Sequence, residues 1–150
     1  MQPELSGYDY ILQRQLKPEP RADIIKKFNE ANVKPTSMID ISDGLASDVM
    51  HICESSGKGC ALYEEKIPID PVTVTMAEEF KIDPTTAALN GGEDYELLFT
   101  IAQNDFEKLK NISGITPIGH ITESGTNLVT RSGSLIPLTA QGWDAFIRNR

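Results

Sequence analysis

The feature that most constrains this fold is a short apolar segment that leads directly into an amphipathic helix. Residues 37–41 read as a buried strand, and residues 44–56 carry apolar side chains at the spacing of one helical face. Only Ser42-Asp43-Gly44 connects the two elements. The polar side chains of Ser42 and Asp43 therefore lie at a helix N-terminus, which offers free N–H groups and a partial positive charge.

Further helices and strands follow in no strict strand–helix–strand order. The other predicted helices are residues 22–32, 72–80, 84–88, 105–110 and 141–147. The other predicted strands are residues 60–63, 95–101, 116–121, 127–130 and 135–138. This pattern predicts an α+β fold with one mixed or antiparallel sheet that is flanked by helices.

The chain of 150 residues is long enough for one domain with a core of its own. We expect residues 22–150 to form this domain. Residues 1–21 are expected to be a lead-in or interdomain linker, because a short apolar stretch there is stopped by Pro18 and Pro20.

The composition limits the partners and the compartment. A net charge of −8 repels nucleic acid and anionic membranes. No apolar run approaches the roughly 18–20 residues of a membrane span, and the first residues lack the pattern of a signal peptide. Cys53 and Cys60 form no CxxC motif, so we expect two reduced thiols in a cytoplasmic protein.

The strand–helix junction carries the first candidate site. Asp40 and Asp43 are three residues apart with Ser42 between them, and such oxygen ligands suit Mg²⁺ that is shared with substrate phosphates. Asp40 interrupts an apolar strand at its carboxyl end, where ligand crevices lie in α/β sheets. For Asp43 a second interpretation stays open, because Asp is a favoured helix N-cap residue. No glycine-rich phosphate loop is present.

A second acidic motif occurs fifty residues later. Asn90-Gly91-Gly92 reads as a turn, and Glu93-Asp94 follows at the start of the predicted strand 95–101. Two carboxylates at a strand start favour a binding site. A solvated hairpin end is the alternative.

Taken together, these strings resemble the C-terminal half of thiamine-monophosphate kinase. The resemblance is carried by a D-x-S-D-G-L junction at residues 40–45 and an N-G-G-E-D-Y-E-L-L-F strand at residues 90–99. It also includes an I-G-x-I segment at residues 118–121, a glycine–tryptophan pair at residues 142–143 and a linker-like stretch at residues 14–21. The first string alone also fits the wider superfamily of aminoimidazole ribonucleotide synthetase, selenophosphate synthetase and the hydrogenase-maturation proteins. The implied fold is the C-terminal domain of that superfamily.

The resemblance implies a kinase that transfers a phosphoryl group from ATP to thiamine monophosphate with Mg²⁺ ions, giving thiamine diphosphate. Asp40 matches a Mg²⁺ ligand, and Asp43 matches a second Mg²⁺ ligand or general base. Ser42 matches a nucleotide contact. Glu93 and Trp143 match contacts to thiamine monophosphate, although Trp143 could equally pack the last helix onto the core.

The resemblance also implies an N-terminal domain that carries much of the ATP and Mg²⁺ site and the homodimer interface. We therefore expect this chain to fold and to lack turnover by itself. Two other interpretations stay open: the C-terminal domain of another ATP-using synthetase of the superfamily, and a non-catalytic acidic binding module.

Overall fold

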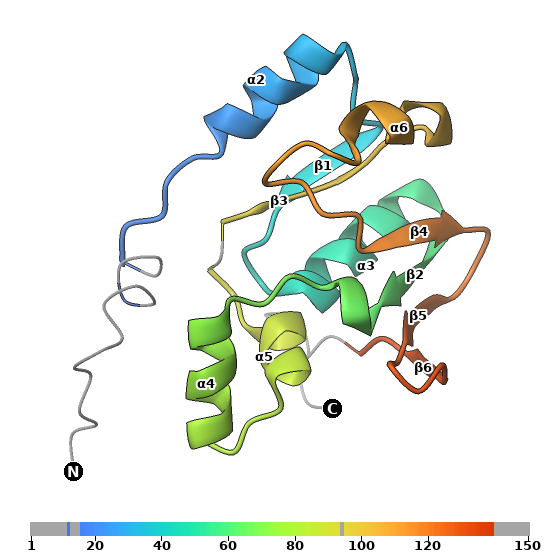
Figure 1. Ribbon diagram of the computed structural model, residues 1–150. Coiled ribbons are helices and arrows are strands. Elements are labelled where there is room, and N and C mark those ends of the chain that lie inside the picture. The colour runs from blue at the N-terminus through green and yellow to red at the C-terminus, as the bar shows by residue number, and fades with distance from the viewer. Residues whose placement is uncertain (1–11, 13–15, 94, 140–150) are drawn as a thin grey trace, which may run out of the picture.

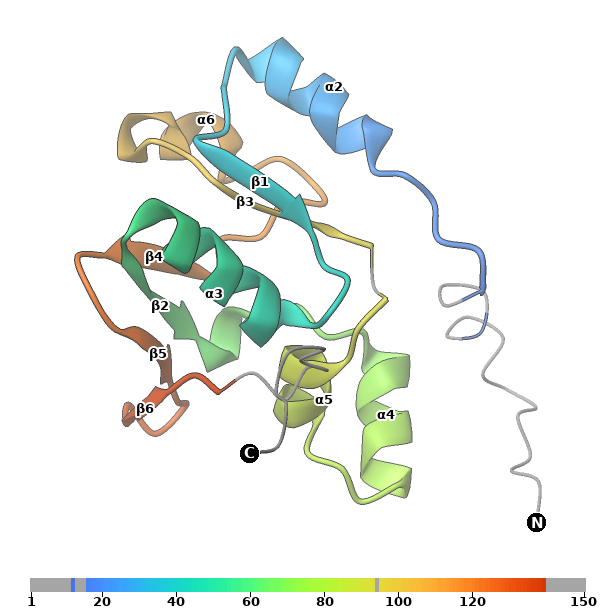
Figure 2. The ribbon, with the colours of Figure 1, turned by 180° about the vertical axis from the view of Figure 1, so that it is seen from behind.

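The computed structural model describes residues 12, 16–93 and 95–139, and Figures 1 and 2 show their arrangement. The helices of this part are α2 (Ala22–Ala31), α3 (Leu45–Ser56), α4 (Pro71–Glu79), α5 (Pro84–Asn90) and α6 (Phe106–Leu109). Its strands are β1 (Ser37–Asp40), β2 (Gly59–Tyr63), β3 (Leu97–Thr100), β4 (Gly119–Thr122), β5 (Thr126–Val129) and β6 (Leu135–Pro137). Single 3-10 turns follow β2 and precede α6, at Glu64–Lys66 and Gln103–Asp105. Among these described helices, none combines the length and the hydrophobicity needed to cross a bilayer.

The α+β class is confirmed, but the strands divide between two sheets where one was expected. β1 and β3 form an antiparallel pair. The other sheet has the order β4-β2-β5-β6, in which β2 and β5 are parallel and the remaining pairs are antiparallel. Helix α3 packs against both sheets (Figure 1). Its side chains contribute to the core that the two sheets share.

The main core therefore surrounds α3. Its members come from the helix and from both sheets: Leu45, Ala46, Val49, Ile52, Cys53, Cys60, Leu62, Ile67, Leu98, Leu128 and Leu138 are all buried. Burial of such side chains contributes about 1.5–3 kcal/mol each for the large aliphatic ones. This core holds the N-terminal end of α3, and with it the first acidic motif, in a fixed place.

The strand pair β1–β3 has a different neighbour on each face. Ile39 is paired with Leu98, and both side chains pack toward the α3 core. The next residue in each strand faces the opposite side of the strand pair. On that side, Phe99 packs against Phe28 of α2 in an edge-to-face contact with ring centroids 4.8 Å apart. Asp40 pairs with Leu97 on this second face.

Three helices end in the same way. Asn32, Gly57 and Lys81 have φ values of 50°, 61° and 57°. After each of them the next N–H group reaches back to a carbonyl five residues earlier, as in a Schellman motif. The prediction of a left-handed C-cap at Gly57 is confirmed.

The predicted helices and strands within the described residues are all present, with ends that shift by up to three residues. The predicted strand start at Tyr95 is wrong, because β3 begins at Leu97 and Tyr95 has a left-handed backbone with φ 51°. The predicted helix 141–147, which carries Trp143, lies outside the described residues.

Candidate functional site

The loop between β1 and α3 takes a shape that depends on glycine. Gly44 is the N-cap of α3 with φ 112° and ψ 149°, a region that only glycine adopts readily. A Cβ atom at this position would lie 3.0 Å from the carbonyl oxygen of Leu89. The start of α3 and the end of α5 are thus in close backbone contact.

Asp43 is not a helix cap. The N-cap position belongs to Gly44, and no side chain caps the helix there. Asp43 itself is exposed. The capping interpretation of Asp43 is therefore wrong, and its carboxylate remains available for another role.

Sequence reasoning missed Asp48, which organises this loop from inside. Its side chain is 1% exposed, and its Oδ2 accepts hydrogen bonds from the backbone N–H groups of Ser42 at 3.0 Å and Asp43 at 3.2 Å. The signal was present in the sequence, because Asp48 is three residues from Leu45 on the apolar face of the helix. A carboxylate in such a position needs partners to offset its desolvation.

The two acidic motifs lie side by side. The N–H of Glu93 donates to the carbonyl oxygen of Ser42 at 2.9 Å, and the N–H of Tyr95 donates to that of Ile41 at 2.9 Å. In return, the N–H of Ile41 donates to the carbonyl oxygen of Glu96 at 2.9 Å. The second motif is therefore bound to the first by its backbone. Because Glu93 is exposed, the alternative of a solvated hairpin end stays open.

Gly91 and Gly92 do not form the predicted turn. Their lack of a side chain instead allows other parts of the backbone to approach them closely. Asn90 is the last residue of α5, and Gly91 continues in an extended conformation. A Cβ atom on Gly91 would lie 2.6 Å from the carbonyl oxygen of Ala87, and one on Gly92 would lie 2.5 Å from that of Ser42. A side chain at Gly92 would push the motifs apart, whereas a side chain at Gly91 would meet the last turn of α5.

Backbone strain is concentrated in the second motif. Glu93 and Tyr95 are non-glycine residues with φ values of 65° and 51°. Such a conformation costs about 1–2 kcal/mol per residue. The hydrogen bonds to the first motif hold both residues there, and strain of this kind clusters at functional sites.

Three possible metal-ligating side chains form a close group, and the carboxylate of Asp40 lies outside it. Ligand atoms of Asp43, Asp48 and His51 all lie within 4.8 Å of one another. Asp40 is outside this group and exposed at the end of β1, on the face shared with Leu97. Oxygen ligands suit Mg²⁺, whereas an imidazole does not favour it. Asp48 already accepts two backbone N–H groups, whereas the carboxylates of Asp40 and Asp43 are exposed.

An ion pair joins the second motif to the segment before α2. The guanidinium of Arg21 contacts the carboxylates of Asp23 and Glu96. The hydrogen bond to Asp23 and the charge of Glu96 raise the pKa of Arg21, and the hydrogen bond from Arg21 lowers the pKa of Asp23. Arg21, which directly precedes α2, is thus attached to Glu96, next to the start of β3.

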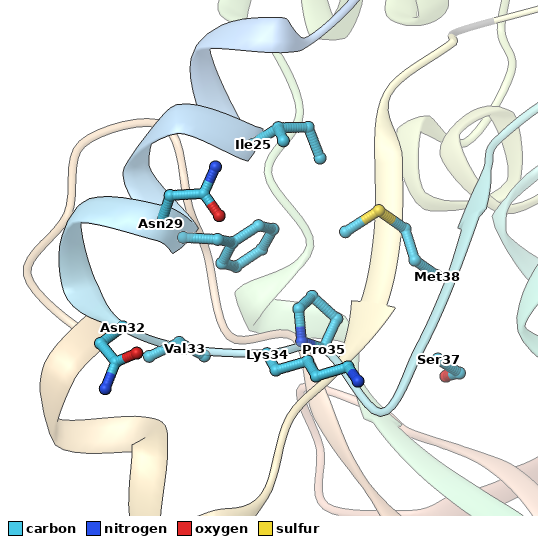
Figure 3. Close-up of a pocket in the computed structure, with 9 residues that line it drawn as sticks. Ile25, Asn29, Asn32, Val33, Lys34, Pro35, Ser37 and Met38 are labelled. Carbon is cyan, nitrogen blue, oxygen red and sulfur yellow. The ribbon is translucent and has the colours of Figure 1, made fainter.

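A cavity among the described residues lies elsewhere. It measures about 550 Å³ and lies between α2 and β1 (Figure 3). Figure 3 shows Ile25, Pro35 and Met38 around it. Its lining contains no carboxylate, so it is separate from the acidic site.

The chain was compared with known families, proteins and structures. No family model matches it. It is 40% identical over 148 residues to thiamine-monophosphate kinase of Buchnera aphidicola subsp. Schizaphis graminum, covering 93% of this chain and 43% of that protein. The same-named protein of Escherichia coli is 33% identical over 147 residues, which cover 92% of this chain and 43% of that protein. The chain therefore spans about two fifths of the length of these curated relatives.

Solved structures give the same result. AaThiL complexed with AMPPCP and TMP matches with a TM-score of 0.78 and 30% identity, over 97% of this chain and 44% of that one. The hydrogenase maturation protein HypE of E. coli matches with a TM-score of 0.65 at 18% identity, which shows the shared fold alone. The chain is therefore a homologue of the thiamine-monophosphate kinases and corresponds to the C-terminal part of these enzymes.

Proposed function

We propose that this chain forms the C-terminal domain of a kinase that phosphorylates thiamine monophosphate with ATP, giving thiamine diphosphate and ADP. The observation that carries the proposal is the direct hydrogen bond between Ser42 of the first motif and Glu93 of the second. It brings a residue proposed to contact the nucleotide next to one proposed to contact the acceptor. Phosphoryl transfer is mostly positioning and charge neutralisation, so such a juxtaposition is what the reaction needs.

Each site residue has a proposed role. Asp40 and Asp43 hold Mg²⁺, and the Ser42 side chain contacts the nucleotide. Asp43 is also the candidate base for the attacking phosphate oxygen. Glu93 binds thiamine monophosphate, and so does Trp143, which lies outside the described residues. When bound, Mg²⁺ supplies the positive charge that this acidic surface lacks for holding phosphates.

The related structure with AMPPCP and TMP supports ATP as the co-substrate and thiamine monophosphate as the acceptor. The described part of the chain offers carboxylates and a helix N-terminus but no lysine or arginine in either motif. We propose that the remaining donors come from an N-terminal domain, joined through residues 1–21, and that the longer protein is a homodimer. The domain proper is residues 22–150. The free thiols Cys53 and Cys60 favour a cytoplasmic protein.

Another ATP-using synthetase of the superfamily is the second candidate. The HypE structures favour it only as far as the fold, since they share 16–23% identity with the chain. The second motif argues for the kinase, because it supplies the acidic residue proposed to bind thiamine monophosphate. A non-catalytic acidic module is the third candidate.

The test is the formation of thiamine diphosphate from thiamine monophosphate and ATP. It uses this chain alone and the complete kinase, meaning this chain joined to the rest of a thiamine-monophosphate kinase. The proposal expects turnover by the complete kinase and none by the chain alone. Absence of thiamine diphosphate from a complete kinase that is folded and binds ATP would refute it.

A further inference from the structure

Asp48 is the only charged side chain that is buried among the described residues. A buried carboxylate costs several kcal/mol of desolvation unless hydrogen bonds compensate for it. Asp48 obtains this compensation from two backbone N–H groups, those of Ser42 and Asp43. An apolar side chain at this position of α3 would fill the core without that cost, so the carboxylate has a purpose beyond packing.

That purpose is visible in the geometry of the loop. One oxygen of Asp48 draws the N–H groups of two consecutive residues inward, at 3.0 Å and 3.2 Å. The carbonyl oxygen of Ser42 is held from the other side by the N–H of Glu93. Both polar groups of the Ser42 backbone are thus fixed by partners outside the loop, and the backbone that carries the Asp43 side chain is fixed with them.

Resting on the proposed function, we infer that Asp48 is a positioning residue for the kinase reaction. It acts through Ser42 and Asp43, whose side chains are proposed to contact the nucleotide and Mg²⁺, and it does not itself contact substrate. Hydrogen bonds to an ionised carboxylate are roughly twice as strong as neutral ones. The negative charge of Asp48 therefore holds these two residues in place more firmly than a neutral side chain of the same shape.

The test compares Asp48→Asn with Val49→Ala in the complete kinase. The first substitution keeps the shape and one acceptor oxygen and loses the charge, whereas Val49→Ala removes a buried core side chain from the same helix and leaves the loop intact. We expect Asp48→Asn to lower kcat and raise the half-saturating concentrations of ATP and Mg²⁺ by about 10–100-fold, the usual effect of losing an outer-shell partner. The KM for thiamine monophosphate should change far less. Val49→Ala should lose thermal stability with its kinetic constants unchanged.

Equal kinetic effects of the two variants, or none in Asp48→Asn, would overturn the inference while the proposed function stands. If Asp48→Asn does not fold, Asp48→Glu replaces it in the test. Asp48→Glu keeps the charge and displaces the oxygens by one methylene, so it should also affect ATP and Mg²⁺ far more than the KM for thiamine monophosphate.

If the wild-type kinase does not phosphorylate thiamine monophosphate, the proposed function fails. Calorimetric titration with Mg²⁺ and AMPPCP then decides the role of Asp48. Weaker binding in Asp48→Asn than in Val49→Ala supports that role, and equal binding overturns it.

Discussion

The N–H of Glu93 donates a 2.9 Å hydrogen bond to the carbonyl oxygen of Ser42, across fifty residues of sequence. It joins two motifs that are separate in the chain into one surface at the N-terminal end of α3. Gly44 and Gly92 permit this contact, because a side chain at either position would meet the backbone of the opposite segment. The proposed nucleotide and acceptor contacts are thereby held by backbone, which is more rigid than side-chain packing.

Gly92→Ala tests this contact. The added methyl group would lie 2.5 Å from the carbonyl oxygen of Ser42 and must displace backbone. We expect a loss of about 1–3 kcal/mol in the free energy of unfolding, measured with urea, and a larger loss of activity in the complete kinase. Gly133→Ala is the matched control, since Gly133 has φ 83° but no atom within 4 Å of the added methyl group. It should lose stability and keep activity, so equal activities of the two variants would contradict the account.

Glu93→Gln tests the acceptor site. A hydrogen bond to a charged group contributes about 1.5–3 kcal/mol, so the KM for thiamine monophosphate should rise about tenfold or more. The dependence of the rate on Mg²⁺ should not change. Glu123→Gln is the control, because Glu123 is an exposed carboxylate paired with Lys58 on the other sheet. Steady-state kinetics with each substrate varied in turn make this measurement, and a raised ATP requirement with an unchanged KM for thiamine monophosphate would assign Glu93 to the nucleotide.

Much of this arrangement was predictable from the sequence. The amphipathic period of residues 44–56 and the glycine after it predicted α3 and its left-handed end, because both depend on local spacing. The division into two sheets was not predictable, since it depends on α3 packing against strands from both parts of the chain. The role of Gly92 was missed for the same reason, because it depends on the backbone of Ser42, which is close in space and distant in sequence. The role of Asp48 was missed although its partners are only five and six residues away.

Lys81→Gly tests the helix ends without involving the site. Lys81 has φ 57° at the end of α4, where the N–H of Ile82 reaches the carbonyl oxygen of Ala77. Glycine removes the cost of this backbone conformation, so we expect the free energy of unfolding to increase by about 1 kcal/mol. Asn32→Gly is the comparison; it should gain less, because Asn tolerates the left-handed region better. A urea titration that shows Lys81→Gly to be less stable than wild type would contradict the assignment.

The thiol of Cys60 gives a pH-dependent prediction. Burial, together with the neighbouring Cys53 thiol, raises the pKa of Cys60 to about 12 from its ordinary value of 9.0. The reactive thiolate is therefore scarce at pH 8, and iodoacetamide should label Cys60 only when urea unfolds the chain. The free energy of unfolding should fall as the pH rises from about 9 toward about 12, because the unfolded thiol ionises first. The Cys60→Ala variant should lose this part of the pH dependence, and rapid labelling of the folded wild type would contradict burial.

The most direct test of the central claim is the rate of thiamine diphosphate formation by the complete kinase that carries both Asp40→Asn and Asp43→Asn. We propose that these two carboxylates are the Mg²⁺ ligands of this chain. We therefore expect a loss of at least about tenfold in kcat that excess Mg²⁺ restores only in part, while the double variant stays folded because both side chains are exposed. Wild-type rates at every Mg²⁺ concentration would contradict the assignment of the ion to the first acidic motif.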